Sequence, residues 1–137
     1  MGKVIENTQL INVFDATKSE EVEAVIDTGA TMLVVPQDVV DRLGLTKTRD
    51  VHVKYANGKV ETKGVYSAVT VKLKGRSGTF DVLAENVGSQ ALIGQVVLEV
   101  LDLVVDPRSR QLTPNPSSPD TPMVEVLGYE SPGVISG

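Results

Sequence analysis

The sequence has 137 residues, 41% of them hydrophobic and 23% charged, which predicts one globular domain with its own core. Its net charge of −5 and its aromatic content of only 4% argue against nucleic acid as the main partner. It has no cysteine and a single histidine, which excludes thiol catalysis, disulfides and a cysteine or histidine metal cluster.

No apolar stretch is long enough to cross a membrane, and the first residues contain no signal-peptide core. We therefore expect an intracellular protein that acts in the cytoplasm, without a membrane partner. The basic residues Lys72, Lys74 and Arg76 are interpreted as the solvated face of a strand and its turn, and His52 as a strand residue.

The N-terminal part of the chain predicts a hairpin that ends in a carboxylate. Residues 8–14 and 21–26 have the apolar pattern of strands, with a polar turn between them. The second strand is followed at once by Asp27, Thr28, Gly29 and Ala30. An acid at the end of a buried strand is costly unless it is hydrogen-bonded or functional, and glycine lets the backbone turn toward it. Asp27 is therefore a candidate catalytic residue, although Asp-Thr-Gly also occurs in ordinary turns.

Two short helices are predicted further along the chain. Pro36 is suited to the first position of a helix that Gly44 ends, and the apolar residues between them share one face. A second helix is expected over residues 96–101, after the apolar run Ala91 to Gly94, despite its β-branched content.

Two hairpins are predicted between these helices. The first spans residues 51–71, with a type I′ turn at Asn57-Gly58. The second joins residues 69–73 to 79–84 through a turn placed at Gly75–Gly78.

A change of composition divides the chain into a domain of residues 1–113 and a proline-rich tail of residues 114–137. Within the tail, Met123–Leu127 is a candidate strand. The pattern leaves three alternatives open for the tail, namely disorder, docking on the domain, or a substrate-like segment for self-processing.

Taken in chain order, several of these features resemble the retroviral-type (retropepsin-like) aspartic proteases, particularly their small cellular and bacterial relatives. They are Asp27-Thr28-Gly29, the hairpin around Asn57-Gly58, Ala91-Leu92-Ile93-Gly94 and the helical run after it. The resemblance implies a mostly all-β fold, a retropepsin-like half-barrel with a flap hairpin and one or two short helices.

The resemblance also implies an aspartic endopeptidase that acts on polypeptide substrates and needs no metal or organic cofactor. Such an enzyme activates water between two carboxylates, and this chain carries only one Asp-Thr-Gly. The second carboxylate must then be Asp27 of another copy, so a homodimer is expected. Thr28 and Gly29 complete the catalytic turn, and the residues expected to bind substrate are Ala30, Ala56, Asn57 and Gly58.

Three departures from the family pattern are informative. Thr31 and Gln95 stand where viral members carry an ion pair near the dimer contact, and a hydrogen bond between these two side chains is the expected replacement. Asp102 stands where many relatives have glycine, and aspartate tolerates left-handed backbone better than most residues. The viral interface strand has no clear equivalent, so Leu112-Thr113 and Val124–Leu127 are its candidates.

Two other interpretations of the sequence remain open. One is a catalytically silent dimerisation or peptide-binding module on the same fold, since fold does not fix function. The other is an unrelated all-β binding domain with a chance Asp-Thr-Gly.

Overall fold

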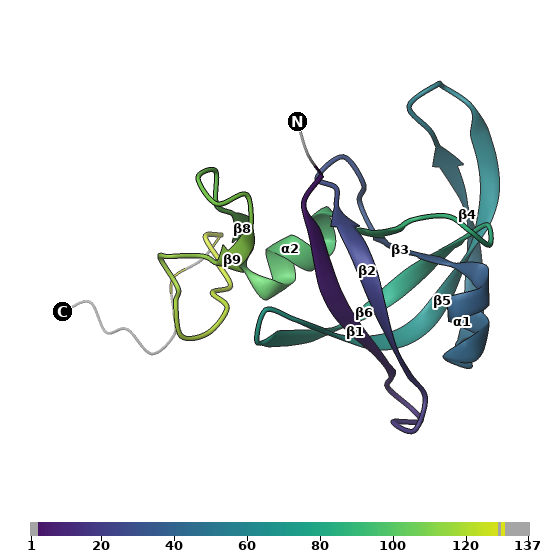
Figure 1. Ribbon diagram of the computed structural model, residues 1–137, viewed down its shortest axis with the longest axis horizontal. Coiled ribbons are helices and arrows are strands. Elements are labelled where there is room, and N and C mark those ends of the chain that lie inside the picture. The colour runs from purple at the N-terminus through teal and green to yellow at the C-terminus, as the bar shows by residue number, and fades with distance from the viewer. Residues whose placement is uncertain (1–2, 129, 131–137) are drawn as a thin grey trace.

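The computed structural model describes residues 3–128 and 130. Seven strands form one sheet in the order β1-β2-β7-β3-β6-β5-β4, and a further pairing of β1 with β5 closes it into a barrel that leaves β4 outside (Figure 1). Strands β8 and β9 form a separate two-stranded sheet. The elements are β1 Ile5–Asn12, β2 Ser19–Ile26, β3 Leu33–Pro36, α1 Gln37–Arg42, β4 Thr46–Lys54, β5 Val60–Leu73, β6 Arg76–Glu85, β7 Ala91–Ile93, α2 Gln95–Leu101, β8 Leu103–Val105 and β9 Leu112–Pro114. The predicted all-β class with two short helices is confirmed.

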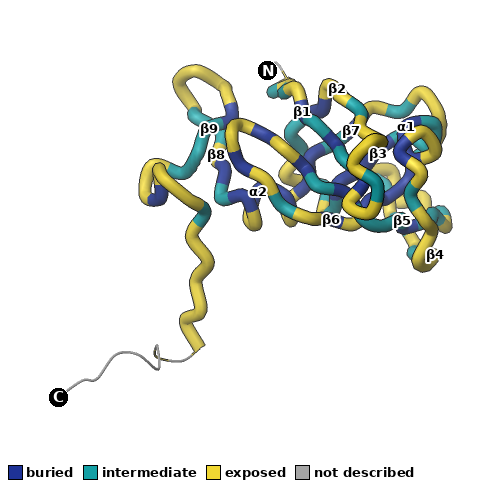
Figure 2. The backbone as a smooth tube through the Cα atoms, turned by 90° about the horizontal axis from the view of Figure 1, so that it is seen from below, coloured by how far each residue is buried: buried dark blue, intermediate teal, exposed yellow. Residues whose placement is uncertain are grey.

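The strands close around one apolar core, which appears in Figure 2 as buried stretches alternating with exposed ones along the chain. The alternation follows from the strand period of two, which sends every second side chain inward. Each fully buried leucine or valine contributes about 1.5–3 kcal/mol through removal from water. The bulkiest of these side chains are Leu10, Leu33, Leu43, Ile93, Leu101 and Leu112.

The hairpin of β1 and β2 that leads to Asp27 is confirmed, but its first strand begins and ends earlier than predicted, at Ile5 and Asn12. The side-chain oxygen of Asn12 accepts a hydrogen bond from the Phe14 backbone N–H at 2.8 Å. The Asn12 side-chain amide donates to the Leu43 carbonyl at 2.8 Å, so the Asn12 side chain is held in a buried position at the end of the strand. The prediction that residues 13 and 14 continue the strand is therefore wrong, and Phe14 is exposed.

The hairpin of β4 and β5 is confirmed, but its predicted turn type is wrong. A type I′ turn needs positive φ at both central residues, and here only Gly58 has it, at +84°. The Gly58 N–H donates to the Tyr55 carbonyl at 2.9 Å, and the Asn57 side chain accepts from the Lys59 N–H at 2.9 Å. The tip is thus a three-residue loop, Ala56 to Gly58, with glycine in the left-handed position.

The two-residue turn with positive φ at both positions lies instead between β5 and β6. Lys74 and Gly75 have φ of 51° and 77°, and Leu73 pairs with Arg76 across them. The prediction therefore placed this turn too far toward the C-terminus, at Gly75–Gly78. Gly78 lies within β6, where an added Cβ would come within 3.1 Å of side-chain carbons of the core.

Both helices have the C-terminal residues that the sequence predicts, but Pro36 is not the first helical residue. It is the last residue of β3 and the N-cap of α1, and Gly44 follows the helix with a φ of +66°. Asp102 is the C-cap of α2 in left-handed geometry, with a φ of 54°. Aspartate adopts this geometry at small cost, so the fold accommodates the departure from glycine.

The segment after β9 is fixed to the end of α2 by Asp102 and Arg76. The Asp102 carboxylate accepts from the Asn115 side-chain amide at 3.0 Å, the Met123 N–H at 3.1 Å and the Ser118 hydroxyl. The Arg76 guanidinium donates to the Leu101 and Asp102 carbonyls and to the Ser118 carbonyl. Arg76 is only 7% exposed, so the interpretation of this residue as part of a solvated face is wrong.

The chain beyond these contacts leaves the barrel (Figure 2). Residues 123–127 belong to no strand, so the strand predicted there is wrong, and Val124 and Leu127 are largely exposed. Residues 129 and 131–137 of the predicted tail lie outside the described residues. The division of the chain at residue 113 stays a prediction.

Two truncations test which part of this segment stabilises the barrel. Removing residues 124–137 is expected to leave the melting temperature unchanged, because the described side chains from 124 to 128 are exposed. Removing residues 116–137 also removes Ser118, which leaves buried Arg76 short of an acceptor. A lost hydrogen bond to a charged group costs about 1.5–3 kcal/mol, or roughly 5–10 °C in a domain of this size. Thermal unfolding measured by circular dichroism gives both values, and equal melting of the two truncated chains would contradict a stabilising role.

Candidate active site

Asp27 directly follows β2, and three hydrogen bonds fix the turn that begins with this residue. Its N–H donates to the Ile93 carbonyl at 3.0 Å, and its carbonyl accepts from the Ala30 N–H at 3.1 Å. The Gly29 N–H donates to Asp27 Oδ1 at 2.9 Å, so one carboxylate oxygen is held by the backbone of its own turn. The residue is only partly exposed. The carboxylate is therefore oriented but accessible.

Glycine at position 29 favours this close approach. An added Cβ there would lie 3.2 Å from Asp27 Oδ1, so the carboxylate would have to shift by a few tenths of an ångström. Thr28 and Gly29 are exposed, whereas Ala30 is half-buried behind them. The structure thus brings four of the predicted site residues, Asp27 to Ala30, into one tight turn.

Strand β7 and the start of helix α2 lie against this turn and hydrogen-bond to it. Strand β7 lies parallel to β2, with Ile93 opposite Ile26, and it separates β2 from β3, which follows β2 in sequence. Immediately after β7, Gly94 passes so close to the chain that an added Cβ would lie 2.3 Å from the Met32 carbonyl oxygen. The N–H of Gln95 then donates to the Ala30 carbonyl at 2.7 Å. The run Ala91 to Gly94 therefore holds the Asp27 turn in place.

The expected side-chain hydrogen bond between Thr31 and Gln95 is not formed in this protomer. The Gln95 side-chain amide donates to Glu99 Oε1 at 3.2 Å, because the two residues are four positions apart on α2. Positions 31 and 95 are instead linked through the backbone, where the Val96 N–H donates to the Thr31 carbonyl at 3.0 Å. That prediction is wrong for the single protomer.

The other predicted substrate-binding residues, Ala56, Asn57 and Gly58, form the tip of the β4–β5 hairpin. All three are exposed, and the hairpin projects from the side of the barrel at which β2 ends (Figure 1). This hairpin, Thr46–Leu73 with its tip, is the one predicted to act as a flap, and we use the name flap for it below. The structure places its tip on a different element from the Asp27 turn, as predicted from the chain order.

A small apolar cluster lies between the flap and the segment that follows Asp27. Val34, Val65 and Leu83 are buried there. The partly buried residues packed against them are Met32, Val51, Val53 and Leu92. This apolar cluster was not predicted from the sequence. The alternation of Val51 and Val53 with polar residues in β4 was a signal that one face of this strand is apolar.

A polar network between the flap and the end of β6 was also missed. The Tyr55 hydroxyl donates to Glu85 Oε2 at 2.6 Å, and Lys63 Nζ lies 2.8 Å from Glu85 Oε1. The hydrogen bond to Glu85 raises the pKa of Tyr55 to about 12. Burial raises the pKa of Glu85, but hydrogen bonds from Lys63, Tyr55 and the Asn86 N–H outweigh it, and the pKa ends below its ordinary value. No local pattern signals this contact, because Tyr55 and Glu85 are 30 positions apart.

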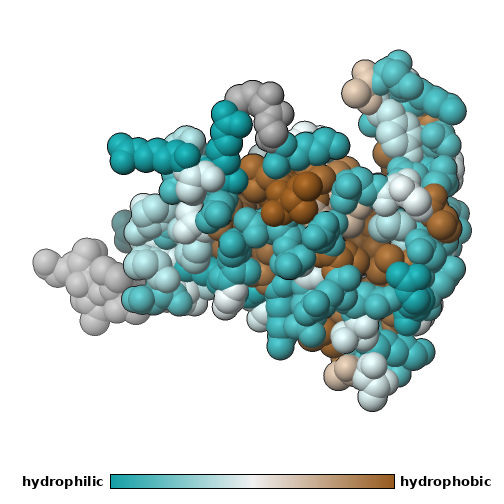
Figure 3. Space-filling view, viewed as in Figure 1, coloured by the Kyte–Doolittle hydropathy of each residue, from teal (hydrophilic) through white to brown (hydrophobic). Residues whose placement is uncertain are grey.

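An apolar hollow of about 380 Å³ lies beside α2. Met32, Phe80, Val96 and Val100 line it, together with polar groups that include Arg49. Val96 and Val100 are both 40% or more exposed, and Figure 3 shows apolar surface over α2 and the adjoining end of β1. This face adjoins the segment that carries Asp27, which suits a contact surface near the site.

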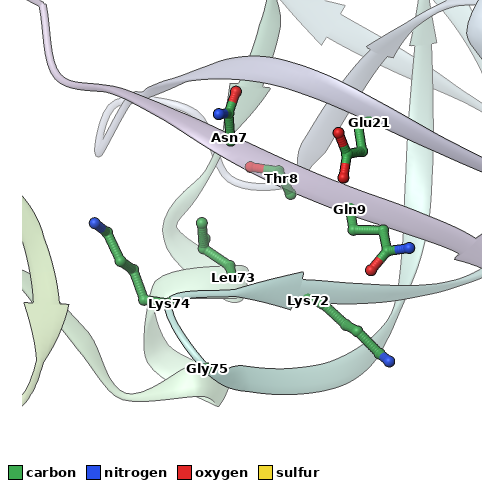
Figure 4. Close-up of a pocket in the computed structure, with 8 residues that line it drawn as sticks. All are labelled: Asn7, Thr8, Gln9, Glu21, Lys72, Leu73, Lys74 and Gly75. Carbon is green, nitrogen blue, oxygen red and sulfur yellow. The ribbon is translucent and has the colours of Figure 1, made fainter.

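A second hollow, of about 180 Å³, lies between β1 and the turn of Lys74 and Gly75 (Figure 4). Lys72 and Lys74 point away from each other at its rim, so they do not converge on a ligand. None of its lining residues belongs to the Asp27 turn or the flap tip, and we assign it no role in the site.

The described residues form neither a metal-ligand cluster nor a membrane-spanning helix. Within residues 3–128 and 130, no three His, Cys, Asp or Glu side chains are grouped as metal ligands would be. The helices in this part of the chain are all too short or too polar to cross a bilayer.

The closed barrel, the β4–β5 flap and the Asp27 turn define a retropepsin-like aspartic protease fold. The family model described as gag-polyprotein putative aspartyl protease matches residues 17–100, and the chain belongs to that family. No curated protein matches the sequence.

Solved structures of viral proteases are similar to this chain. One is EIAV protease complexed with the inhibitor HBY-793, with 21% identity and a TM-score of 0.52 over 71% of this chain and 86% of that chain. Another is the solution structure of simian foamy virus (mac) protease, with 20% identity and a TM-score of 0.48 over 69% of this chain and 90% of that chain. At this identity the EIAV likeness is evidence for the fold.

Proposed function

We propose that this protein is an aspartic endopeptidase whose active site forms when two copies bring their Asp27 carboxylates together on a two-fold axis. The observation that carries the proposal is the Asp27 turn itself. It presents a partly exposed carboxylate, with one oxygen held by the Gly29 N–H, at the end of a core strand. Asp-Thr-Gly occurs once in the sequence, so a second carboxylate in the same geometry requires a second copy.

The two Asp27 carboxylates have different roles in hydrolysis. Two acids this close do not both ionise, so they share one proton, as is established for aspartic-protease dyads. The ionised Asp27 takes a proton from water as its oxygen attacks the peptide carbonyl carbon, while the protonated Asp27 donates a hydrogen bond to the carbonyl oxygen. Proton transfer to the amide nitrogen then lets the carbon–nitrogen bond break.

The surrounding residues position substrate and partner. Thr28 is exposed next to Asp27, so its hydroxyl is available to the equivalent turn of the second copy. An extended polypeptide lies between the Asp27 turn, including Ala30, and the backbone of the flap tip. The partly exposed members of the apolar cluster, among them Met32, Val51 and Val53, favour apolar substrate side chains near the cleaved bond. We further propose that the protein acts in the cytoplasm.

Cleavage of a peptide library by the purified chain tests the proposal. The expected result is cleavage that pepstatin inhibits and that the Asp27→Asn variant lacks. A folded, dimeric chain with no cleavage of any peptide would favour the alternative, a catalytically silent dimerisation or peptide-binding module.

Mixing the chain with its Asp27→Asn variant tests the shared site. If each active site needs two Asp27 residues, an equimolar mixture that exchanges subunits should have about half the activity of the same amount of wild type diluted with an inert protein. Specific activity of the wild type should also fall on dilution, as dimers dissociate. Sedimentation velocity at the assay concentrations measures the dimer fraction, and full activity from a strict monomer would contradict the proposal.

A further inference from the structure

We propose that Tyr55, Lys63 and Glu85 form a latch that fixes the resting position of the flap tip, with Tyr55 as a positioning residue for substrate binding. We call these three residues the flap latch. Its effect on cleavage rests on the proposed function, whereas its effect on the flap does not.

The latch joins the tip of the flap to the barrel. Tyr55 lies between the last residue of β4 and the exposed tip, and its hydroxyl donates to Glu85 at 2.6 Å. Glu85 is the last residue of β6, which lies next to β3 and β5 in the sheet. The bond therefore runs from the tip to the barrel, and not only to the opposite strand of the same hairpin.

The Glu85 carboxylate, which accepts from Tyr55, is also held in place by two other donors. Glu85 Oε1 accepts from Lys63 Nζ at 2.8 Å and from the Asn86 N–H at 3.0 Å, which leaves Oε2 for the tyrosine. The side chains of Lys63 and Glu85 are only 11% and 16% exposed. Water and salt screen so sheltered a pair less than a surface ion pair. Because both carboxylate oxygens are used, the carboxylate has one preferred orientation, and Tyr55 has one place to bind.

Fixing Tyr55 also fixes the tip, because the tip's hydrogen bonds lead back to this residue. The Tyr55 carbonyl accepts from the Gly58 N–H, and the Tyr55 N–H donates to the Lys59 carbonyl, each at 2.9 Å. The Ala56 side chain is exposed and Gly58 has no side chain, so neither residue adds another anchor. With the latch made, a substrate meets a flap that is already ordered, so less ordering entropy is lost on binding.

Amide exchange measured by NMR in the Asp27→Asn background tests the latch without any need for activity. Tyr55→Phe removes only the hydroxyl, so the amides of Tyr55, Gly58 and Lys59 should exchange about tenfold faster, while the melting temperature should fall by no more than about 5 °C. Tyr66→Phe makes the same chemical change on a ring packed against the core, and these three amides should then exchange at the parent rate. Adding Glu85→Ala to Tyr55→Phe should accelerate them little beyond Glu85→Ala alone, because both changes break one contact.

Cleavage kinetics with Asp27 intact supply the functional measurement. Tyr55→Phe should raise KM several-fold while kcat changes less, because the loss falls on flap ordering and not on the carboxylates. Unchanged exchange of the three amides would overturn the latch, and a uniform rise in exchange across the barrel would make Tyr55 a stabilising residue only. If the wild type cleaves nothing, the exchange experiment still decides the latch, so its failure is distinct from failure of the proposed function.

Discussion

Replacing Asp27 by asparagine is expected to lower kcat/KM for peptide cleavage by about a thousandfold or more, because an amide cannot take the proton of the attacking water. The fold should survive the change, since the two side chains are nearly the same size. The Gly29 N–H that now donates to Asp27 Oδ1 can donate equally to an asparagine oxygen. The backbone bond from the Asp27 N–H to the Ile93 carbonyl does not involve the side chain.

A matched variant separates the chemistry from the loss of a negative charge. Asp41 is an exposed residue of α1 whose carboxylate accepts from the Gln37 side chain at 2.9 Å, so Asp41→Asn removes the same charge away from the site. It should retain wild-type cleavage. Both variants should have the wild-type circular dichroism spectrum and dimer fraction. Residual cleavage by Asp27→Asn that pepstatin still inhibits would place the chemistry elsewhere.

The Asp27 turn could be predicted from sequence because the bonds within it are local, although Ile93 and Gln95 hold it from far along the chain. The bonds within the turn join residues two or three positions apart, such as Gly29 to Asp27 and Ala30 to Asp27. The helix end at Gly44 is also local, because the left-handed backbone there favours glycine. Features that depend on a few neighbouring residues can be predicted from a single sequence.

The flap latch and the contacts after β9 could not be predicted because their partners are distant in sequence. Arg76 has the composition of a surface residue, yet it binds backbone carbonyls up to 42 positions away and is buried. The turn type at Asn57-Gly58 failed for a different reason. Asn-Gly is compatible with two-residue and three-residue loops, and the register of β4 against β5 selects between them.

The insertion of β7 between β2 and β3 also depends on distant contacts. It gives Gly94 the closest added-Cβ contact of the glycines that the structure describes. Gly94→Ala would place a Cβ 2.3 Å from the Met32 carbonyl oxygen and 2.7 Å from the Ala30 carbonyl oxygen. Both are backbone atoms, so no side-chain rotation relieves the overlap. The Ala30 carbonyl is also held by the Gln95 N–H at 2.7 Å, and separating the chains breaks that bond.

We expect Gly94→Ala to lower the free energy of unfolding by at least about 3 kcal/mol, because an overpacked site next to backbone has no room to relax. Any folded fraction should also lose cleavage, because relief of the overlap displaces the segment that carries Asp27. Gly128→Ala is the matched control, since nothing lies within 4 Å of its added Cβ. That change should alter stability by less than about 0.5 kcal/mol. Urea unfolding followed by circular dichroism compares both variants with the wild type. An unchanged midpoint for Gly94→Ala would mean that the two backbone segments separate at little cost, and that the close crossing does not hold the Asp27 turn.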